Sequence, residues 1–159
     1  QRDVKPGDVG ELWVRGKGLM LGYYKRPDAN AEVFTDDWFH TGDLFVSDGD
    51  GFLKIIGRIK EMIRRSGENI SAREVESVLK RHSDVADAAV IAVPDAIRKE
   101  EVKAFVQLAT HVETSVLQEE IIVKHCREHL AAFKVPRYFE FVSKFPRTPT
   151  GKIKKRNLS

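Results

Sequence analysis

The sequence predicts an α+β protein in which the end of a β-rich large domain precedes a small mixed domain, a short sheet flanked by helices. Three observations indicate this class. Glycines separate short apolar runs throughout the first third of the chain. Apolar residues take helical spacing only after Ser71. The stretch 57–65, dense in charge, lies where one pattern replaces the other, so we expect the boundary there.

Short strands and tight turns are expected in the glycine-punctuated third. Residues 11–15 and 52–56 are apolar runs of strand length. The sequence Ser-Asp-Gly-Asp-Gly at residues 47–51 lies between two apolar runs, which is typical of a hairpin turn that uses glycine where φ is positive.

The second part of the chain mixes helices and strands. Ser71 and Glu74 form a capping box, which predicts a helix that begins at Ser71 and continues toward His82. Residues 85–93 and 102–108 are β-branched and apolar, and they predict two strands joined by the polar segment 95–101.

A second helix and a last strand follow. Pro136 is expected to end this helix, and residues 138–142 are expected to form the strand. The tail, residues 146–159, carries five basic residues and no acidic one. The apolar face of the helix is expected to consist of Leu117, Ile121, Ile122, Cys126 and Leu130.

Composition limits the compartment and the partners. The 159 residues carry a formal charge of +3, which permits anion binding but does not establish it. Cys126 is the only cysteine, so no internal disulfide can form and a reducing, cytoplasmic location is expected. The longest apolar stretch, residues 85–93, is broken by Asp87 and is far shorter than the roughly 20 residues of a membrane helix, so no transmembrane segment is expected.

Three short motifs occur in a fixed order. The first is Trp-Phe-His-Thr-Gly-Asp-Leu at residues 38–44. The second is Gly-Arg-Ile-Lys-Glu-Met-Ile at 57–63, leading to Gly-Glu-Asn-Ile at 67–70, and the third is Pro-Thr-Gly-Lys-Ile at 149–153. Together they resemble the carboxyl-terminal portion of the adenylate-forming enzymes, the superfamily of acyl-CoA synthetases, peptide-synthetase adenylation domains and luciferases. Within it, the sequence is most similar to fatty-acid and carnitine-type CoA ligases.

The resemblance implies an ATP-dependent reaction that makes an acyl-adenylate from a carboxylic acid. It implies that Asp43 and Arg58 bind the ribose of ATP or AMP. A carboxylate suits this role because it accepts hydrogen bonds from two hydroxyl groups at once. The resemblance also implies that Lys152 is the catalytic residue. Its ammonium would orient the acyl carboxylate and stabilise charge at the α-phosphate, without a general base.

The resemblance further implies transfer of the acyl group to coenzyme A. Lys60 falls at the hinge position of the family, where the small domain pivots between two catalytic arrangements. A solvated basic linker formed by Lys60, Arg64 and Arg65 is the alternative. The positions that match the coenzyme A contacts of the family are Gly67, Glu68, Phe133, Lys134 and Arg137.

The resemblance divides the chain into residues 1–59, the last strands of an incomplete large domain, and residues 60–159, the mobile small domain. The phosphate loop, the magnesium-associated Thr-Glu motif and the acid pocket of the family belong to the rest of the large domain. We therefore expect ATP, Mg²⁺ and coenzyme A to act in the full-length enzyme together with its own N-terminal domain. This segment alone is expected to be inactive and to bind none of them tightly.

Other functions remain as alternatives. One is a ligase that loads the phosphopantetheine of a carrier protein, and another is a non-catalytic regulatory module. A polyanion-binding module is a third, but no nucleic-acid partner is expected because the basic tail lacks interleaved aromatic residues. Residues 125–129 match a His-x-x-Glu-His zinc pattern without an identifiable third ligand, so no metal site is expected.

Overall fold

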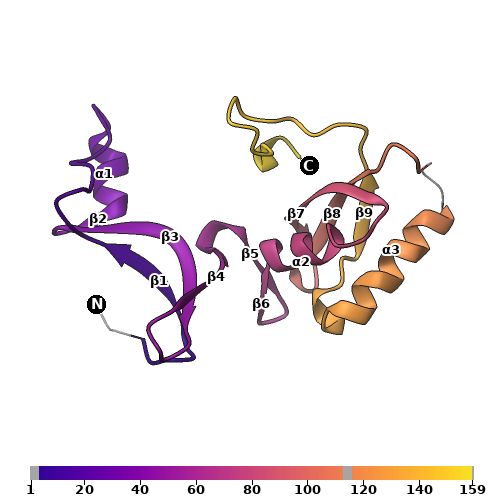
Figure 1. Ribbon diagram of the computed structural model, residues 1–159, viewed down its shortest axis with the longest axis horizontal. Helices are drawn as coiled ribbons and strands as arrows, with labels where there is room; N and C mark the ends of the chain where they lie inside the picture. The colour runs from indigo at the N-terminus through magenta and orange to yellow at the C-terminus, as the bar shows by residue number, and fades with distance from the viewer. Residues whose placement is uncertain (1–3, 113–115, 159) are drawn as a thin grey trace. The chain divides into compact units, whose positions relative to one another are not determined.

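The computed structural model describes residues 4–112 and 116–158 (Figure 1). The side chain of Leu117 and the last tail residue, Ser159, lie outside the described part. The chain forms two compact units, one ending at Lys60 (unit 1) and one beginning at Glu61 (unit 2). The large-domain and small-domain identities predicted for the two sides of this division stay predictions.

Unit 1 is built around one long strand. β3 (Trp38–Ser47) pairs antiparallel with β1 (Val9–Val14), β2 (Phe34–Thr35) and β4 (Leu53–Arg58). The predicted hairpin joins β3 to β4, with positive φ at Gly49 and Gly51. A short helix, α1 (Pro27–Val33), begins at a proline, whose fixed φ suits a first helical position. This helix and β2 were not predicted.

Unit 2 contains a five-stranded sheet with β8 (Lys99–Leu108) at its centre (Figure 1). β7 (Val85–Asp95) pairs antiparallel with β8, and β9 (Tyr138–Phe141) pairs parallel with it. β5 (Met62–Arg65) joins β8 at one residue pair and continues the sheet to β6 (Glu68–Ser71). The predicted strands are confirmed. The polar segment 95–101 is shorter as a turn than expected, because Asp95 and Lys99 already pair across the hairpin.

α2 begins where the sequence predicts, and both helices of unit 2 end earlier than expected. α2 (Ala72–Leu79) has Ser71 as its N-cap, and the Ser71 hydroxyl accepts a hydrogen bond from the Glu74 amide. α3 (Val116–His129) ends at His129, so Pro136 does not end it. A 3₁₀ turn, η2 (Ala132–Lys134), lies between them. Two further 3₁₀ turns are η1 (Ile59–Glu61) and η3 (Lys155–Asn157).

The strands of unit 2 are apolar on both faces because each face is covered. Side chains alternate across a strand, so Ala88 and Val90 face α2 and α3, whereas Ala89 faces the other side. We call the first cluster the helix-side core. The second cluster, the tail-side core, is completed by the carboxyl-terminal segment: its members are Ala89, Phe105 and Phe145, with Ile91, Val142, Ile153 and Leu158 packed against them.

Candidate functional site

The structure brings Asp43 and Arg58 of unit 1 together. The two residues are register partners on β3 and β4, and Arg58 Nε donates to Asp43 Oδ1 at 2.7 Å. The pair is open to solvent, with 26% of the Asp43 side chain and 60% of the Arg58 side chain exposed. A carboxylate and a guanidinium therefore lie side by side at a surface that hydroxyl groups of a ligand can reach.

Residues of β1 hold the backbone beside Asp43. Gly42 has a φ of 70°, a conformation that favours glycine, and its amide donates to the Glu11 carboxylate at 2.9 Å. Thr41 Oγ1 donates to the Leu12 carbonyl at 2.8 Å and accepts from the Asp43 amide at 3.1 Å. The Thr-Gly-Asp sequence therefore forms a fixed kink in β3 that presents the Asp43 carboxylate.

Lys152 lies in a small closed loop of unit 2. The Thr148 amide donates to the Lys152 carbonyl at 2.8 Å, and the Lys152 amide donates to Thr148 Oγ1 at 3.1 Å. Gly151, with a φ of 84°, makes the turn. Lys152 is exposed, and among the described residues its ammonium has no hydrogen bond or ion pair. The loop therefore presents a cation that no residue of the described chain neutralises.

The segment after Lys152 is fixed by partly buried ion pairs. Lys155 Nζ lies 2.7 Å from Glu61 Oε2 and 2.8 Å from Glu76 Oε1. Burial lowers the pKa of Lys155, but the charges and hydrogen bonds of Glu76 and Glu61 outweigh it and raise the pKa above its usual value. Because Glu61 follows Lys60 directly, this interaction joins the tail to the residue next to the predicted hinge.

Lys60 lies within η1 at the division between the two units and is exposed. The alternative of a solvated basic linker is wrong for Arg65. Arg65 lies on β5, its side chain is only 15% exposed, and its Nε donates to the fully buried Glu101 at 2.8 Å. The sequence gave no indication of this partnership, because 36 residues separate the two.

Gly67 and Glu68 belong to a tight hairpin. Ser66 and Gly67 connect β5 to β6 with φ values of 50° and 90°, as a two-residue hairpin turn of type I′ requires. The Ser66 amide donates to the Arg98 carbonyl at 3.1 Å, which fixes the hairpin against the turn between β7 and β8. Glu68 is exposed beside it.

Phe133, Lys134 and Arg137 lie around η2, and their charges are already engaged. Lys134 Nζ lies 2.7 and 2.8 Å from the two oxygens of Glu74. Arg137 NH1 lies 3.5 Å from Asp95 Oδ2. The Phe133 ring packs against the helix-side core, and the Lys134 ammonium is 5.7 Å from its centroid. A phosphate at this position would have to compete with these carboxylates.

Glu101 is a buried carboxylate that sequence reasoning missed. Its side chain is 0% exposed and accepts from Arg65 Nε and Arg98 NH1, each at 2.8 Å, and Arg137 NH1 lies 3.6 Å away. Three arginines from separate segments therefore surround one carboxylate. The only sequence signal was a charged residue at the start of an apolar strand.

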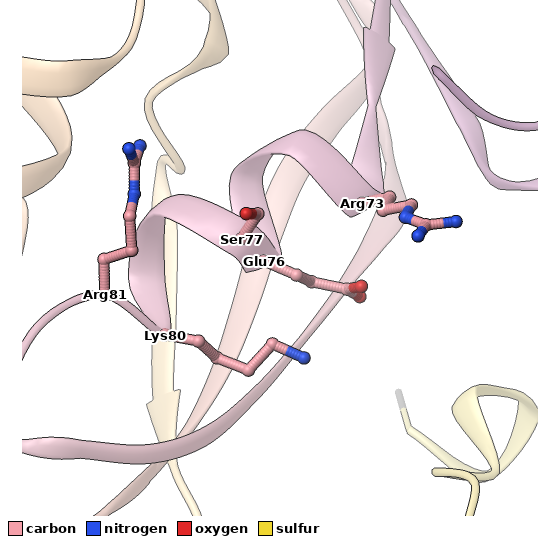
Figure 2. Close-up of a pocket in the computed structure, with 5 residues that line it drawn as sticks. All are labelled: Arg73, Glu76, Ser77, Lys80 and Arg81. Carbon is pink, nitrogen blue, oxygen red and sulfur yellow. The ribbon is translucent and has the colours of Figure 1, made fainter. Parts of the chain in front are cut away.

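The remaining polar clusters do not gather around a ligand position. A depression of about 310 Å³ on α2 is lined by Arg73, Glu76, Ser77, Lys80 and Arg81. Figure 2 shows Arg73 and Arg81 pointing away from each other, so these two guanidinium groups do not converge on one ligand. In the zinc pattern, His125 Nε2 lies 3.0 Å from the Val78 carbonyl. Among residues 4–112 and 116–158, no group of three or more His, Cys, Asp or Glu could hold a metal ion.

The described chain has neither a membrane-spanning helix nor an exposed thiol. No helix of the described chain is long and apolar enough to cross a membrane. Cys126 is buried in the helix-side core, and burial raises the pKa of its thiol to about 11. The thiol is therefore protonated at neutral pH and unsuited to nucleophilic chemistry.

Comparison with known proteins shows the relationships of the chain. Residues 74–152 match the family described as AMP-binding enzyme C-terminal domain. The chain is 43% identical to the long-chain-fatty-acid–CoA ligase of Salmonella typhimurium strain LT2, over 98% of the chain and 27% of that protein. It is 42% identical to the crotonobetaine/carnitine–CoA ligase of Proteus mirabilis strain HI4320, over 99% of the chain and 30% of the relative.

The fold agrees with solved structures of such enzymes. The o-succinylbenzoate CoA synthetase of Bacillus subtilis, solved with its acyl-adenylate intermediate, superposes with a TM-score of 0.89 at 34% identity, covering 99% of this chain and 32% of that one. The chain thus spans less than a third of the length of these relatives. With its α+β fold, its ordered motifs and these relatives, the chain belongs to the adenylate-forming, AMP-binding superfamily and corresponds to the carboxyl-terminal portion of its acyl-CoA ligases.

Proposed function

We propose that this chain serves an ATP-dependent acyl-CoA synthetase and supplies its adenylation lysine, its hinge and part of its coenzyme A channel. The observation that carries the proposal is the Lys152 ammonium, which has no hydrogen bond or ion pair with any described residue, on a closed, anchored loop. An unpaired cation held by backbone hydrogen bonds is suited to stabilising charge that develops on a phosphate. The likeness to CoA ligases over nearly the whole chain supports it.

In the first half-reaction, an oxygen of the acid carboxylate attacks the α-phosphorus of ATP, and the bond to pyrophosphate breaks. Lys152 would orient the carboxylate and stabilise the negative charge of the transition state. Asp43 would accept hydrogen bonds from the ribose hydroxyls, and Arg58 would hold the Asp43 carboxylate while it contacts the ribose. Mg²⁺ enters the proposal only with ATP, in the full-length enzyme.

In the second half-reaction, the coenzyme A thiol attacks the acyl carbonyl, and AMP leaves. Backbone rotation at Lys60 would exchange the Lys152 loop for the Ser66–Gly67 hairpin at the reacting centre. Gly67 and Glu68 would flank the pantetheine arm, and Phe133, Lys134 and Arg137 would meet the nucleotide end of coenzyme A. The ion pairs of Lys134 and Arg137 would then be exchanged for contacts with phosphate.

The pocket that selects the acid substrate would lie in the part of the enzyme outside this chain. Relatives of nearly equal identity are named for a long-chain fatty acid and for carnitine, so similarity in this region does not specify the acid. A cytoplasmic location is part of the proposal, and the single cysteine of this chain, which is free and buried, supports it. A carrier-protein phosphopantetheine is the alternative acceptor, because it presents the same thiol.

The non-catalytic alternatives are a regulatory module and a polyanion-binding tail. In the tail, Lys155 and Arg147 are already paired with carboxylates.

Exchange of labelled pyrophosphate into ATP by the full-length enzyme, across a panel of carboxylic acids, tests the adenylation step. We expect exchange with one class of acid, and we expect Lys152→Ala to lower it by about 10²–10³-fold, the usual cost of removing one preorganised charge donor. Thioester formation from a preformed adenylate should persist. Lys144→Ala, which removes another exposed lysine of the same segment, is the control. Exchange that survives in Lys152→Ala would refute the assigned role.

A matched pair of variants tests the hinge. Lys60→Pro restricts the backbone, whereas Lys60→Ala removes only the charge. Because backbone rotation carries the proposed role, we expect Lys60→Pro to slow thioester formation more than adenylation, and Lys60→Ala to affect neither step strongly. Equal effects of the two variants on thioester formation would remove Lys60 from the hinge.

A further inference from the structure

Arg147 joins the Lys152 loop to the sheet. Its guanidinium donates through NH2 to Asp87 Oδ2 on β7 at 2.6 Å and through NH1 to the Gly151 carbonyl at 3.0 Å. The Gly151 carbonyl belongs to the peptide bond that continues into Lys152. One rigid, planar group therefore contacts both the sheet and the backbone next to the free ammonium.

The sheet end of this bridge is itself fixed. Asp87 lies on β7 where the register with β8 shifts between Val85 and Asp87, and its carboxylate also accepts from the Ala88 amide at 2.9 Å. Lys80 Nζ lies 3.6 Å from Asp87 Oδ1, the oxygen that also accepts from the Ala88 amide. With 20% of its side chain exposed, Asp87 is an anchor whose position is set by the strand and two further donors.

The other interactions of the loop act differently. The hydrogen bonds among Thr148, Gly151 and Lys152 close the loop on itself and fix its shape. The packing of Phe145 and Ile153 in the tail-side core attaches both arms of the loop to the sheet. Apolar packing is non-directional, whereas the two N–H groups of Arg147 fix direction as well as distance.

We propose that Arg147, anchored by Asp87, is a positioning residue for adenylation: it sets the orientation of the Lys152 loop relative to the sheet of unit 2. This inference rests on the proposed function, because it assigns Arg147 a role through Lys152. Displacement of a reacting group by about 1 Å can lower the rate about 10²-fold. Because Gly151 directly precedes Lys152, a contact at Gly151 is close enough to the ammonium to affect the rate of adenylation.

The test uses the full-length enzyme and compares Arg147→Met, Arg147→Lys, Asp87→Asn and the double variant Asp87→Asn/Arg147→Met. We expect Arg147→Met to lower the kcat of pyrophosphate exchange by roughly 10–10²-fold, with the KM for ATP and the rate of thioester formation from preformed adenylate close to wild type. Arg147→Lys keeps a charge for Asp87 but has one nitrogen in place of the planar guanidinium whose NH1 and NH2 bind two partners, so its kcat should be intermediate. The double variant should be no worse than Arg147→Met, because the two side chains act as one unit.

Two controls separate positioning from general loss of structure. Arg127→Met removes an exposed arginine on α3 and should leave kcat unchanged. Cleavage by trypsin after Lys152 in the native enzyme reports the loop directly, and Arg147→Met should accelerate it relative to Arg127→Met. Wild-type kcat in Arg147→Met would overturn the inference, and so would equal losses in both half-reactions together with a lowered Tm.

The same experiment distinguishes failure of the inference from failure of the proposed function. A wild-type enzyme without pyrophosphate exchange for any acid would overturn the proposed function, and with it the role of Arg147. Exchange that depends on Lys152 but is insensitive to Arg147→Met would overturn the inference alone.

Discussion

The two units of this chain hold their functional residues by different means. Of the described residues of unit 1, only Gly57 is buried, and the kinked β3 of this unit is held by hydrogen bonds that it donates to β1. Unit 2 has a helix-side core and a tail-side core on opposite faces of one sheet. The comparison teaches that, within this chain, buried apolar side chains are concentrated in unit 2, whereas in unit 1 local hydrogen bonds set the geometry. Unit 1 exposes large apolar side chains, among them Met20, Leu21, Tyr23, Tyr24, Phe52 and Leu53.

The largest contrast is expected between the ion pairs of the two units. Glu101→Gln should destabilise unit 2 by about 3–5 kcal/mol, because it leaves buried arginine charge without its partner. Asp43→Asn in the exposed pair of unit 1 should cost only about 0–1 kcal/mol. Urea unfolding measures both. Circular dichroism follows α2 and α3, and fluorescence follows unit 1, which holds both tryptophans, Trp13 and Trp38. Equal costs would break the comparison.

A pair of apolar truncations sharpens the same contrast. Ile70, on β6, is fully buried in the helix-side core, so Ile70→Ala should cost about 2–5 kcal/mol. Leu53, on β4 of unit 1, is 51% exposed, so Leu53→Ala should change stability by no more than about 0.5 kcal/mol. The shift in the urea unfolding midpoint gives the stability cost of each variant, provided that the dependence of the unfolding free energy on urea concentration is unchanged. A cost for Leu53→Ala near that for Ile70→Ala would mean that unit 1 has a core of its own.

The helix N-termini of the two units predict a smaller difference. The Ser71 hydroxyl caps α2, and Ser71→Ala should cost about 1 kcal/mol. Arg26, at the corresponding position of α1, makes no capping hydrogen bond, so Arg26→Ala should be nearly neutral. Thermal unfolding of the two variants, followed by circular dichroism, compares them. A larger loss for Arg26→Ala would contradict the capping assignment.

The smallest effect concerns acid stability in unit 2. Burial raises the pKa of Asp87, but hydrogen bonds from Arg147 and the Ala88 amide, with the charge of Lys80, outweigh it and hold the pKa below its usual value. Asp87 therefore stabilises the fold fully above its ordinary pKa of about 3.9, and this contribution is lost as pH falls through the depressed pKa.

Urea midpoints measured from neutral pH downward test this assignment. In Asp87→Asn, the urea midpoint should fall less steeply as the pH decreases than it does in the wild type. Arg147→Met removes the main donor to the Asp87 carboxylate, so it should reproduce most of this change in the pH dependence. Parallel pH curves for wild type and Asp87→Asn would show that the carboxylate does not contribute.

Local patterns in the sequence predicted most elements of unit 2. The capping box located the start of α2, because its side-chain bond spans only three residues. The apolar runs located β7 and β8. The end of α3 could not be located from Pro136, because the chain leaves the helix at His129 and enters η2 first. β5 and β6 were missed, because Met62–Arg65 carries as much charge as a linker and its buried arginine is identified only by Glu101.

For the candidate site as well, the sequence predicted local features but not the contacts between distant residues. Asp43 and Arg58 could be paired with a common function from their motifs, and the antiparallel register of β3 and β4 explains their contact. The loop of Lys152 could be recognised from Pro-Thr-Gly-Lys-Ile. Its anchoring could not, because Arg147 and Asp87 are 60 residues apart and Lys155 and Glu61 are 94 apart.

By itself, the sequence determined the fold class, the start of α2, the hairpin turn at residues 47–51 and the family, because each depends on residues close along the chain or on motifs in a fixed order. Only the tertiary structure decided which charges are free and which are paired. Lys152 is unpaired among the described residues, whereas Lys155, three positions later, is held by two carboxylates. The reason is physical: the state of a charged side chain depends on the dielectric and the partners around it, and strand pairing and tail packing bring those partners from distant parts of the chain.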